Sequence, residues 1–166
     1  MRRSLSLLSL ALAGCLFTSE EVEPRKAALR VADSPEAFFE LFRLAYETRS
    51  ATSLDRLLAS DYLFEANPGE ITDGSATSWG KEAELDRHRR MFQAISDVSM
   101  EVMPDALTRP EAASAETTWT VPRLRMTMAI AGDPVEVVGQ AEFRLRTVRD
   151  KDGSPTYLLV RWTDRN

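Results

Sequence analysis

The final third of the chain alternates apolar and polar residues, which is the pattern of strands with one buried face. The alternation runs through residues 116–164 and is interrupted twice. Gly132, Asp133 and Pro134 form the first interruption, and residues 150–154 (Asp-Lys-Asp-Gly-Ser) form the second. Both interruptions consist of residues that favour turns. The pattern therefore predicts three long strands joined by two tight turns.

The two faces of this predicted sheet differ in polarity. One face carries charges of both signs, at Glu136, Glu142, Arg144, Arg146 and Arg161. Because burying five charges is very costly, we assign this face to solvent and the apolar face to the core. The apolar face comprises Leu124, Met126, Met128, Ile130, Val135, Val137, Gly139, Ala141, Phe143, Leu145, Leu158, Val160 and Trp162. A glycine inside the longest strand, Gly139, predicts a bulge or a sharp bend.

The preceding residues predict three helices and two short strands. Ser34 followed by Pro35 is typical of a helix N-terminus, with serine as the N-cap and proline at the first helical position. We expect this helix to end near Thr48. Ser50 is a candidate cap for a short second helix. The other predicted elements are a strand at 62–65, a loop at 66–78, a helix at 79–95, a strand at 98–103 and a polar connection at 104–113.

The first residues have the order of a secretory signal, with a basic start, an apolar run and small residues. The apolar run from Leu5 to Leu12 is too short to span a bilayer as a permanent helix. The segment Leu12-Ala13-Gly14-Cys15 resembles the lipobox of bacterial lipoproteins. The resemblance implies cleavage before Cys15, a diacylglycerol on its thiol and an acyl chain on the new amine. The alternatives are an ordinary signal peptide with an incidental cysteine, or an internal apolar start.

The lipobox divides the chain into a signal peptide (1–14), a lipidated cysteine with a flexible tether (15–33) and a folded domain (34–166). Several acyl chains together hold a protein stably on a membrane. We therefore expect an exported protein anchored through Cys15, the only cysteine. Leu16 is not the acidic residue that retains lipoproteins in the inner membrane of well-studied bacteria. By that resemblance the periplasmic side of the outer membrane is favoured, with the cell surface as the alternative.

The charge of the chain argues against nucleic acid as a partner. The sequence has 26 acidic and 21 basic residues, which gives a formal net charge of −5. Loss of Arg2 and Arg3 with the signal peptide would lower this charge to −7. Binding of nucleic acid needs a basic surface that neutralises phosphates. The expected partners are the membrane, a small apolar ligand, a second copy of the chain or another envelope protein.

The order of the predicted elements resembles that of nuclear transport factor 2-like domains, also called cystatin-like α+β cones. The resemblance covers residues 34–164 and is carried by the helix that runs into a strand at 57–64 and by the closing segment 160–164. It implies an α+β domain in which three N-terminal helices pack on a curved, mostly antiparallel sheet. A lipocalin-type barrel, the competing exported fold, needs about eight strands, for which the helical half leaves no room.

Domains of this kind enclose a cone-shaped pocket in many members. The domains that this chain resembles include enzymes, such as ketosteroid isomerase, scytalone dehydratase and limonene epoxide hydrolase, and also ligand-binding proteins and scaffolds. The fold alone therefore does not decide the function. The residues that we expect to line the pocket are Tyr46, Tyr62, Trp79, Met126, Met128, Phe143 and Trp162.

His88 is the only histidine and the one candidate for a catalytic base. Three neighbouring arginines favour a solvent-exposed position for it, paired with Glu84 four residues earlier. One histidine and one acylated thiol exclude a multi-histidine zinc site and cysteine catalysis, so we expect neither a metal nor a cofactor. The chain shows no glycine-rich phosphate loop and no hydrolase motif.

These observations leave three hypotheses for the function. The leading one is an anchored lipoprotein whose domain binds a small apolar ligand or an envelope protein without catalysis. The alternative is an isomerase or hydratase that uses His88 with Tyr46 or Tyr62 in the pocket. The third is a structural domain whose own methionine, phenylalanine and tryptophan side chains fill the cone.

Replacement of Cys15 by serine is expected to abolish lipidation and release the protein from the membrane, because a serine hydroxyl does not replace the thiol. The measurement is metabolic labelling with a radioactive fatty acid, followed by separation of membrane and soluble fractions. Thr18→Ser, three residues further along the chain, is the matched control and should stay labelled and membrane-bound. A Cys15→Ser protein that still takes up the label would contradict anchoring through this residue.

Overall fold

The structure is a computed structural model, and it describes residues 31–67, 76–102 and 115–165. The predicted signal peptide, Cys15 and most of the tether lie outside the described residues, as does the connection at 104–113. Among the described residues, the buried apolar side chains run from Ala32 to Val160, so a protein that begins at Leu16 contains all of them. None of the described helices is long and apolar enough to cross a membrane.

Three helices and six strands make up the described part of the chain. They are α1 (Pro35–Glu47), α2 (Ala51–Leu57), β1 (Leu58–Glu65), β2 (Ser78–Gly80), α3 (Lys81–Ala94), β3 (Ile95–Val102), β4 (Glu116–Ile130), β5 (Asp133–Arg149) and β6 (Pro155–Asp164). The side chains of Ser34 and Ser50 cap α1 and α2, as the sequence predicts. The helix α3 follows β1 and β2, so the helices do not all precede the strands.

The predicted start of the third helix is wrong by two residues. Trp79 belongs to the short strand β2, which pairs with β1, and Gly80 is the N-cap of α3. The first strand is also longer than predicted, because β1 begins at Leu58, directly where α2 ends. Trp79 is therefore held by the sheet and not by the helix.

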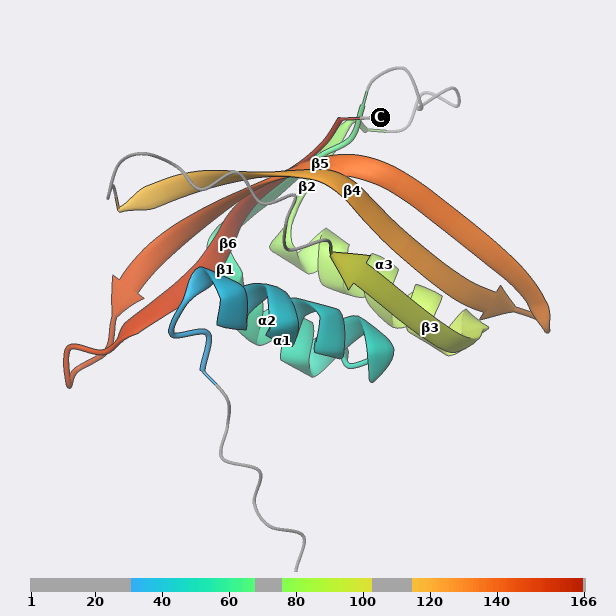
Figure 1. The fold of residues 1–166 in the computed structure, drawn as a ribbon, viewed down its shortest axis with the longest axis horizontal. Helices are drawn as coiled ribbons and strands as arrows, with labels where there is room; N and C mark the ends of the chain where they lie inside the picture. Colours follow the sequence, from blue (N-terminus) through green and yellow to red (C-terminus); the bar gives the residue numbers. More distant parts are fainter. Residues whose placement is uncertain (1–30, 68–75, 103–114, 166) are drawn as a thin grey trace, which may run out of the picture.

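The strands form one sheet in the order β2-β1-β6-β5-β4-β3. Neighbouring strands are antiparallel except β1 and β6, which are parallel. Figure 1 shows the three helices on one side of the sheet, which curves around them. The domain therefore has an α+β architecture with a curved, mostly antiparallel sheet.

The sheet bends where β4 crosses β5. The pairing shifts between Val121 and Leu124 of β4, whose partners are Ala141 and Gly139 of β5. One extra residue is thus inserted in β4, which defines a β-bulge, and bulges bend and twist a strand pair. Pro122 lies in the bulge, one of the positions where sheets accept proline. The irregularity predicted at Gly139 is confirmed, although the extra residue belongs to the neighbouring strand.

A second bulge changes the face assignment of β6. The pairing of β5 with β6 shifts between Arg144 and Leu145. Leu159 lies opposite Leu145 and is fully buried, whereas Leu158 lies opposite Arg146. The predicted apolar face includes Leu158, so strict alternation places Leu159 on the solvent face. Both assignments are wrong, because a bulge reverses the alternation on which they rest.

Aromatic rings of α1 join the helix to the concave face of the sheet. Phe38, Phe42 and Tyr46 are four residues apart and therefore lie on one stripe of the helix. The Phe42 ring meets the rings of Phe143 and Trp162 edge-on, with centroid distances of 5.5 and 5.7 Å. This packing forms the centre of the core.

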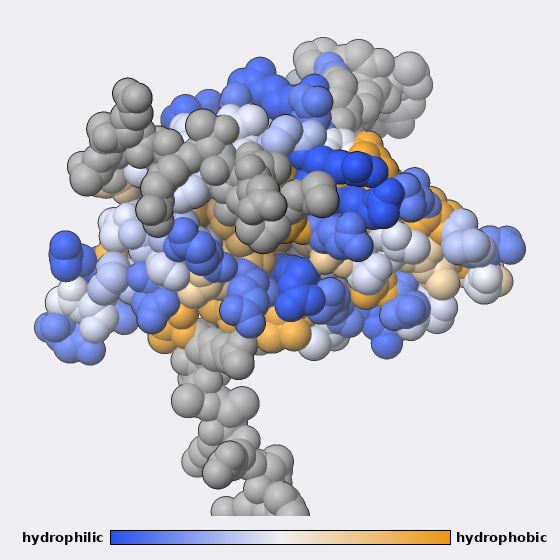
Figure 2. Space-filling view, viewed as in Figure 1, coloured by the Kyte–Doolittle hydropathy of each residue, from blue (hydrophilic) through white to orange (hydrophobic). Residues whose placement is uncertain are grey.

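The end of the sheet at the β4–β5 hairpin is not covered. Val135 and Val137 are 36% and 45% exposed, so the prediction that they face the core is wrong. The reason is that β6 pairs with β5 only from Ala141 onward, which leaves this part of β5 with β4 as its neighbour among the described strands. Figure 2 shows apolar surface near this end of the molecule.

The charged face of the sheet lies toward solvent, as predicted. Arg146 bridges Asp61 and Glu116 at 2.9 and 2.7 Å, and Arg165 contacts Glu142 at 2.6 Å. Exposed ion pairs of this kind contribute little to stability. We therefore look for a functional site on the opposite, concave face of the sheet, which the helices cover.

Candidate functional site

A pocket of about 110 Å³ lies beneath the bend of the sheet. Leu124 and Gly139, which flank the bulge, both line it. Alternation places Val137, Gly139 and Ala141 on the same face of β5, and all three line the pocket. The other lining residues are Tyr46, Phe64, Met100, Met126, Gln140, Trp162 and Asp164.

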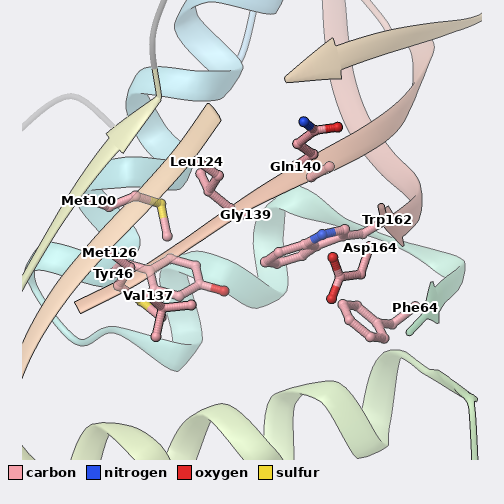
Figure 3. A pocket seen from close by; sticks show the side chains of 11 residues that line it. Tyr46, Phe64, Met100, Leu124, Met126, Val137, Gly139, Gln140, Trp162 and Asp164 are labelled. Carbon is pink, nitrogen blue, oxygen red and sulfur yellow. The ribbon is translucent and has the colours of Figure 1, made fainter. Parts of the chain in front are cut away.

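The residues expected in the pocket fall into three groups. Tyr46, Met126 and Trp162 line it (Figure 3). Met128 and Phe143 are buried in the core. Tyr62 and Trp79 lie next to the pocket, where they form a polar cluster with Tyr46, His88 and Glu84. Gln140 and Asp164 are polar lining residues that the sequence analysis missed.

Tyr46 connects the pocket to this polar cluster. Its hydroxyl oxygen lies 2.5 Å from Nε2 of His88, and the two side chains are 2% and 8% exposed. The expectation that His88 faces solvent is therefore wrong. The arginines around it are exposed, but His88 lies on the buried stripe of α3, one turn before Phe92 and one turn after Glu84.

The hydrogen bonds of His88 assign its neutral tautomer. Nδ1 lies 2.9 Å from the backbone carbonyl oxygen of Glu84, and a carbonyl oxygen can only accept. Nδ1 therefore carries the proton, and Nε2 of the neutral ring is an acceptor. In this neutral form the Tyr46 hydroxyl donates its proton to Nε2.

Glu84 completes the cluster from the first turn of α3. Its side chain is buried; one carboxylate oxygen lies 3.5 Å from His88 Nδ1, and the other accepts a hydrogen bond from the indole N–H of Trp79. The first turn of a helix also favours negative charge, through its free N–H groups and the helix dipole. The pairing of Glu84 with His88 is as predicted, but the pair is buried and not exposed.

Trp79 closes this cluster on its outer side. Its ring stacks on Phe64, with a centroid distance of 4.4 Å and an interplanar angle of 20°, and the Arg87 guanidinium lies 4.0 Å above it. Phe64 also contacts the ring of Trp162 at 5.3 Å. One wall of the pocket is therefore continuous with the residues that enclose Glu84.

Burial keeps both tyrosines of the cluster protonated. It raises the pKa of Tyr46 well above its usual value, and the negative charge of Glu84 adds to the effect. Burial, followed by Glu84, also raises the pKa of Tyr62. The Tyr62 hydroxyl makes no hydrogen bond within the described part of the chain. Both phenols are suited to hydrogen bonding and poorly suited to acting as tyrosinates.

A relay through this arrangement would pass a proton from Tyr46 to His88, against the raised pKa of Tyr46. Glu84 would stabilise the imidazolium that results, as a carboxylate does in other histidine relays. His88 does not line the pocket, so a ligand would meet this relay through Tyr46. Residues 31–67, 76–102 and 115–165 contain no group of three or more side chains that could hold a metal ion.

Solved structures with a similar fold support the predicted architecture. A nuclear transport factor 2-like protein of unknown function in nutrient uptake from Rhodospirillum rubrum is 17% identical over 79% of this chain and 96% of its own, with a TM-score of 0.59. An uncharacterised protein with a cystatin-like fold from Caulobacter vibrioides is 14% identical over 80% and 86%, with a TM-score of 0.54.

A provisionally named scytalone dehydratase from Novosphingobium aromaticivorans is also similar. It is 12% identical over 78% of this chain and 79% of its own, with a TM-score of 0.58. At these identities the likeness shows the fold alone, which is nuclear transport factor 2-like. No protein-family model and no curated protein matches the chain.

The raised pKa values of Tyr46 and Tyr62 predict a loss of stability at alkaline pH. Both phenols ionise near pH 10 in the unfolded chain, whereas the folded protein keeps them protonated. The unfolded state therefore binds fewer protons above about pH 10, and the free energy of unfolding falls by about 1.4 kcal/mol per pH unit for each tyrosine. Below that pH the contribution of both groups is fully present.

The measurement is urea unfolding of the protein beginning at Leu16, from about pH 9 to about pH 11. Tyr46→Phe and Tyr62→Phe should each flatten the slope, by an amount that approaches about 1.4 kcal/mol per pH unit at the alkaline end of this range. Phe38→Leu should lower stability at every pH and leave the slope unchanged. A double tyrosine variant with the slope of the unsubstituted protein would show that neither phenol resists ionisation.

Proposed function

We propose that the protein binds a small, largely apolar ligand in the pocket beneath the bend of β4 and β5. The observation that carries this proposal is a cavity of about 110 Å³ that the domain's own side chains leave open. Small-molecule sites typically have apolar walls and a few polar groups that fix orientation. Met100 and Met126 supply adaptable walls, and Tyr46 supplies a polar group. A cone filled by its own side chains would leave no such space.

We also propose that this domain works outside a membrane, held by the lipid on Cys15. The lipobox at residues 12–15 and the absence of any other cysteine support this location. The periplasmic side of an outer membrane fits Leu16, and an envelope protein or a second copy of the chain remains a candidate partner. The ligand would then be one present in the envelope or imported through it.

Val137→Trp is expected to block the pocket without disturbing the core. Val137 lines the pocket and is nevertheless 45% exposed, so a larger side chain fits at the entrance. The measurement is broadening of the fluorine NMR signal of fluorobenzene by the protein beginning at Leu16. The affinity should fall roughly tenfold or more, which corresponds to about 1.4 kcal/mol.

Val138→Trp is the matched control for this experiment. Val138 is 46% exposed and points to the opposite face of the same strand, so its replacement should leave fluorobenzene binding unchanged. Absence of binding to the unsubstituted protein, or equal binding to Val137→Trp, would show that this pocket is not a ligand site.

General acid–base catalysis of the isomerase or hydratase kind is a second candidate function. The observation that favours it is the buried hydrogen bond between Tyr46 and His88, with Glu84 behind it. Enzymes often place such groups against an apolar wall. The raised pKa of Tyr46 makes its phenol a poor acid, which is why ligand binding comes first.

Catalysis by this relay predicts faster loss of water from diacetone alcohol, a small β-hydroxy ketone whose product absorbs ultraviolet light. Tyr46→Phe and His88→Asn should each lower the rate by roughly a hundredfold or more, the usual contribution of a general acid or base. Val138→Trp should leave the rate unchanged. Equal rates for the unsubstituted protein and both relay variants would contradict catalysis and leave ligand binding standing.

A further inference from the structure

We propose that the charge state of His88 decides which hydrogen bond Tyr46 offers to a ligand in the pocket. With a neutral His88 the Tyr46 hydroxyl presents a lone pair, and with a protonated His88 it presents its proton. Ligands that carry an acceptor, such as a ketone oxygen, therefore bind more tightly in mild acid. This inference rests on the proposed function, and it adds the ligand chemistry and the regulation of the same pocket.

The contact between Tyr46 and His88 permits a hydrogen bond in either direction. The hydroxyl oxygen and Nε2 are 2.5 Å apart, and a hydroxyl both donates and accepts. Nδ1 of His88 donates to the carbonyl oxygen of Glu84 in both charge states, because a carbonyl oxygen only accepts. Nε2 is therefore the nitrogen that gains the proton when the ring becomes charged, and it then changes from acceptor to donor.

Reversal of this bond releases the hydroxyl proton of Tyr46. A phenol has one proton, and while neutral Nε2 receives it, none is left for a ligand. Once Nε2 donates, the phenol oxygen accepts, and its own proton turns to another side of the oxygen. Tyr46 lines the pocket, and in Figure 3 its hydroxyl points toward the side that holds Phe64 and Trp162. The released proton is thus available to an acceptor on a ligand.

Glu84 is the group that favours the charged ring. Its side chain is buried, and one carboxylate oxygen lies 3.5 Å from Nδ1 of His88. An opposite charge at this distance stabilises an imidazolium. Burial of His88 acts in the opposite direction, because loss of hydration disfavours a charge. The cluster therefore contains both influences that a reversible change of charge requires.

The other titratable groups around His88 come from three elements. Tyr46 of α1 and Tyr62 of β1 stay protonated in mild acid, since burial raises the pKa of both phenols. Arg87 of α3 lies on the outer side of the cluster and keeps its charge. Asp164 of β6 lines the pocket on the far side of Tyr46, so the experiment must separate its charge from that of His88.

The experiment uses two probes that share a fluorinated ring, para-fluoroacetophenone and fluorobenzene. The ketone adds a carbonyl acceptor, neither probe has a polar donor, and both stay neutral. Affinities are measured by fluorine NMR with the protein beginning at Leu16, from about pH 8 to about pH 5, the range in which a histidine changes charge. The affinity for the ketone should rise roughly tenfold, the usual contribution of one hydrogen bond, while that for fluorobenzene stays constant.

The histidine itself provides an independent measurement. His88 is the only histidine of the chain, so the imidazole signals of a nitrogen-15-labelled protein belong to it. Coupling between two binding events is reciprocal, so a ligand that prefers the charged ring must favour its protonation by the same factor. Saturation with the ketone should therefore move the midpoint of the His88 titration upward by about one pH unit. Saturation with fluorobenzene should leave the midpoint unchanged.

Tyr46→Phe removes the hydroxyl that couples the ring to the pocket. The pH dependence of ketone affinity and the effect of the ketone on the His88 titration should both disappear. Tyr157→Phe is the matched control, because Tyr157 lies near the start of β6, outside the pocket lining, and its replacement should change neither. If Tyr46→Phe fails to fold, the titration of the unsubstituted protein still tests the proposal.

The outcomes separate this inference from the function on which it rests. If neither probe binds at any pH, both fail. If fluorobenzene binds and the preference for the ketone is the same at about pH 8 and about pH 5, the function stands and the inference is overturned. A pH-dependent preference that leaves the His88 midpoint unmoved, or that persists in Tyr46→Phe, would assign the effect to another group and would also overturn the inference.

Discussion

The bulge in β4 is the constraint on which the site depends. Between Val121 and Leu124 this strand contains one residue more than β5 has between Ala141 and Gly139. The extra length makes the pair bend, since the hydrogen bonds on either side keep their spacing. On one side of the bulge Val121 is fully buried in the core, and on the other Leu124 is a wall of the pocket. A straight ladder would carry the packed core through to the hairpin and leave no cavity.

Burying the polar cluster beside this pocket costs free energy, and each of its members depends on the others for hydrogen bonds. A buried carboxylate that loses a partner typically costs about 3–5 kcal/mol. Glu84 avoids this cost through the indole N–H of Trp79, the first turn of α3 and His88. An apolar cluster of the same shape would be at least as stable. The cluster therefore adds no stability that apolar residues would not also supply. Its position directly behind Tyr46 associates it with the pocket.

Local signals in the sequence were sufficient for much of the fold. Serine caps, turn residues and strand alternation depend on neighbours in the chain, so Ser34, Ser50 and the three long strands were predicted within a few residues. Leu159 was placed on the wrong face because a bulge is a property of two strands, and alternation describes one. The lipobox is equally local, but it lies outside the described residues.

The site was harder to predict because it depends on contacts between elements. His88 was assigned to solvent from its arginine neighbours in sequence, although its spacing from Glu84 and Phe92 matches the buried stripe of α3. That helical spacing was the one available signal. Asp164 and Gln140 had no such signal, because the bend that brings them to the pocket becomes visible only once β4, β5 and β6 are paired.

Binding and catalysis share their geometry at Tyr46 and differ in where one proton resides. The hydrogen bond to His88 fixes the position of the Tyr46 hydroxyl beside the pocket, and the same bond is the path along which a relay would move the proton. Burial and the charge of Glu84 both raise the pKa of Tyr46, so the proton is held on the phenol. A relay would need the opposite balance, with Tyr46 readily giving up its proton as the ligand reacts. The carboxylate of Glu84, which lies beside His88, therefore favours hydrogen bonding by the Tyr46 phenol over transfer of its proton.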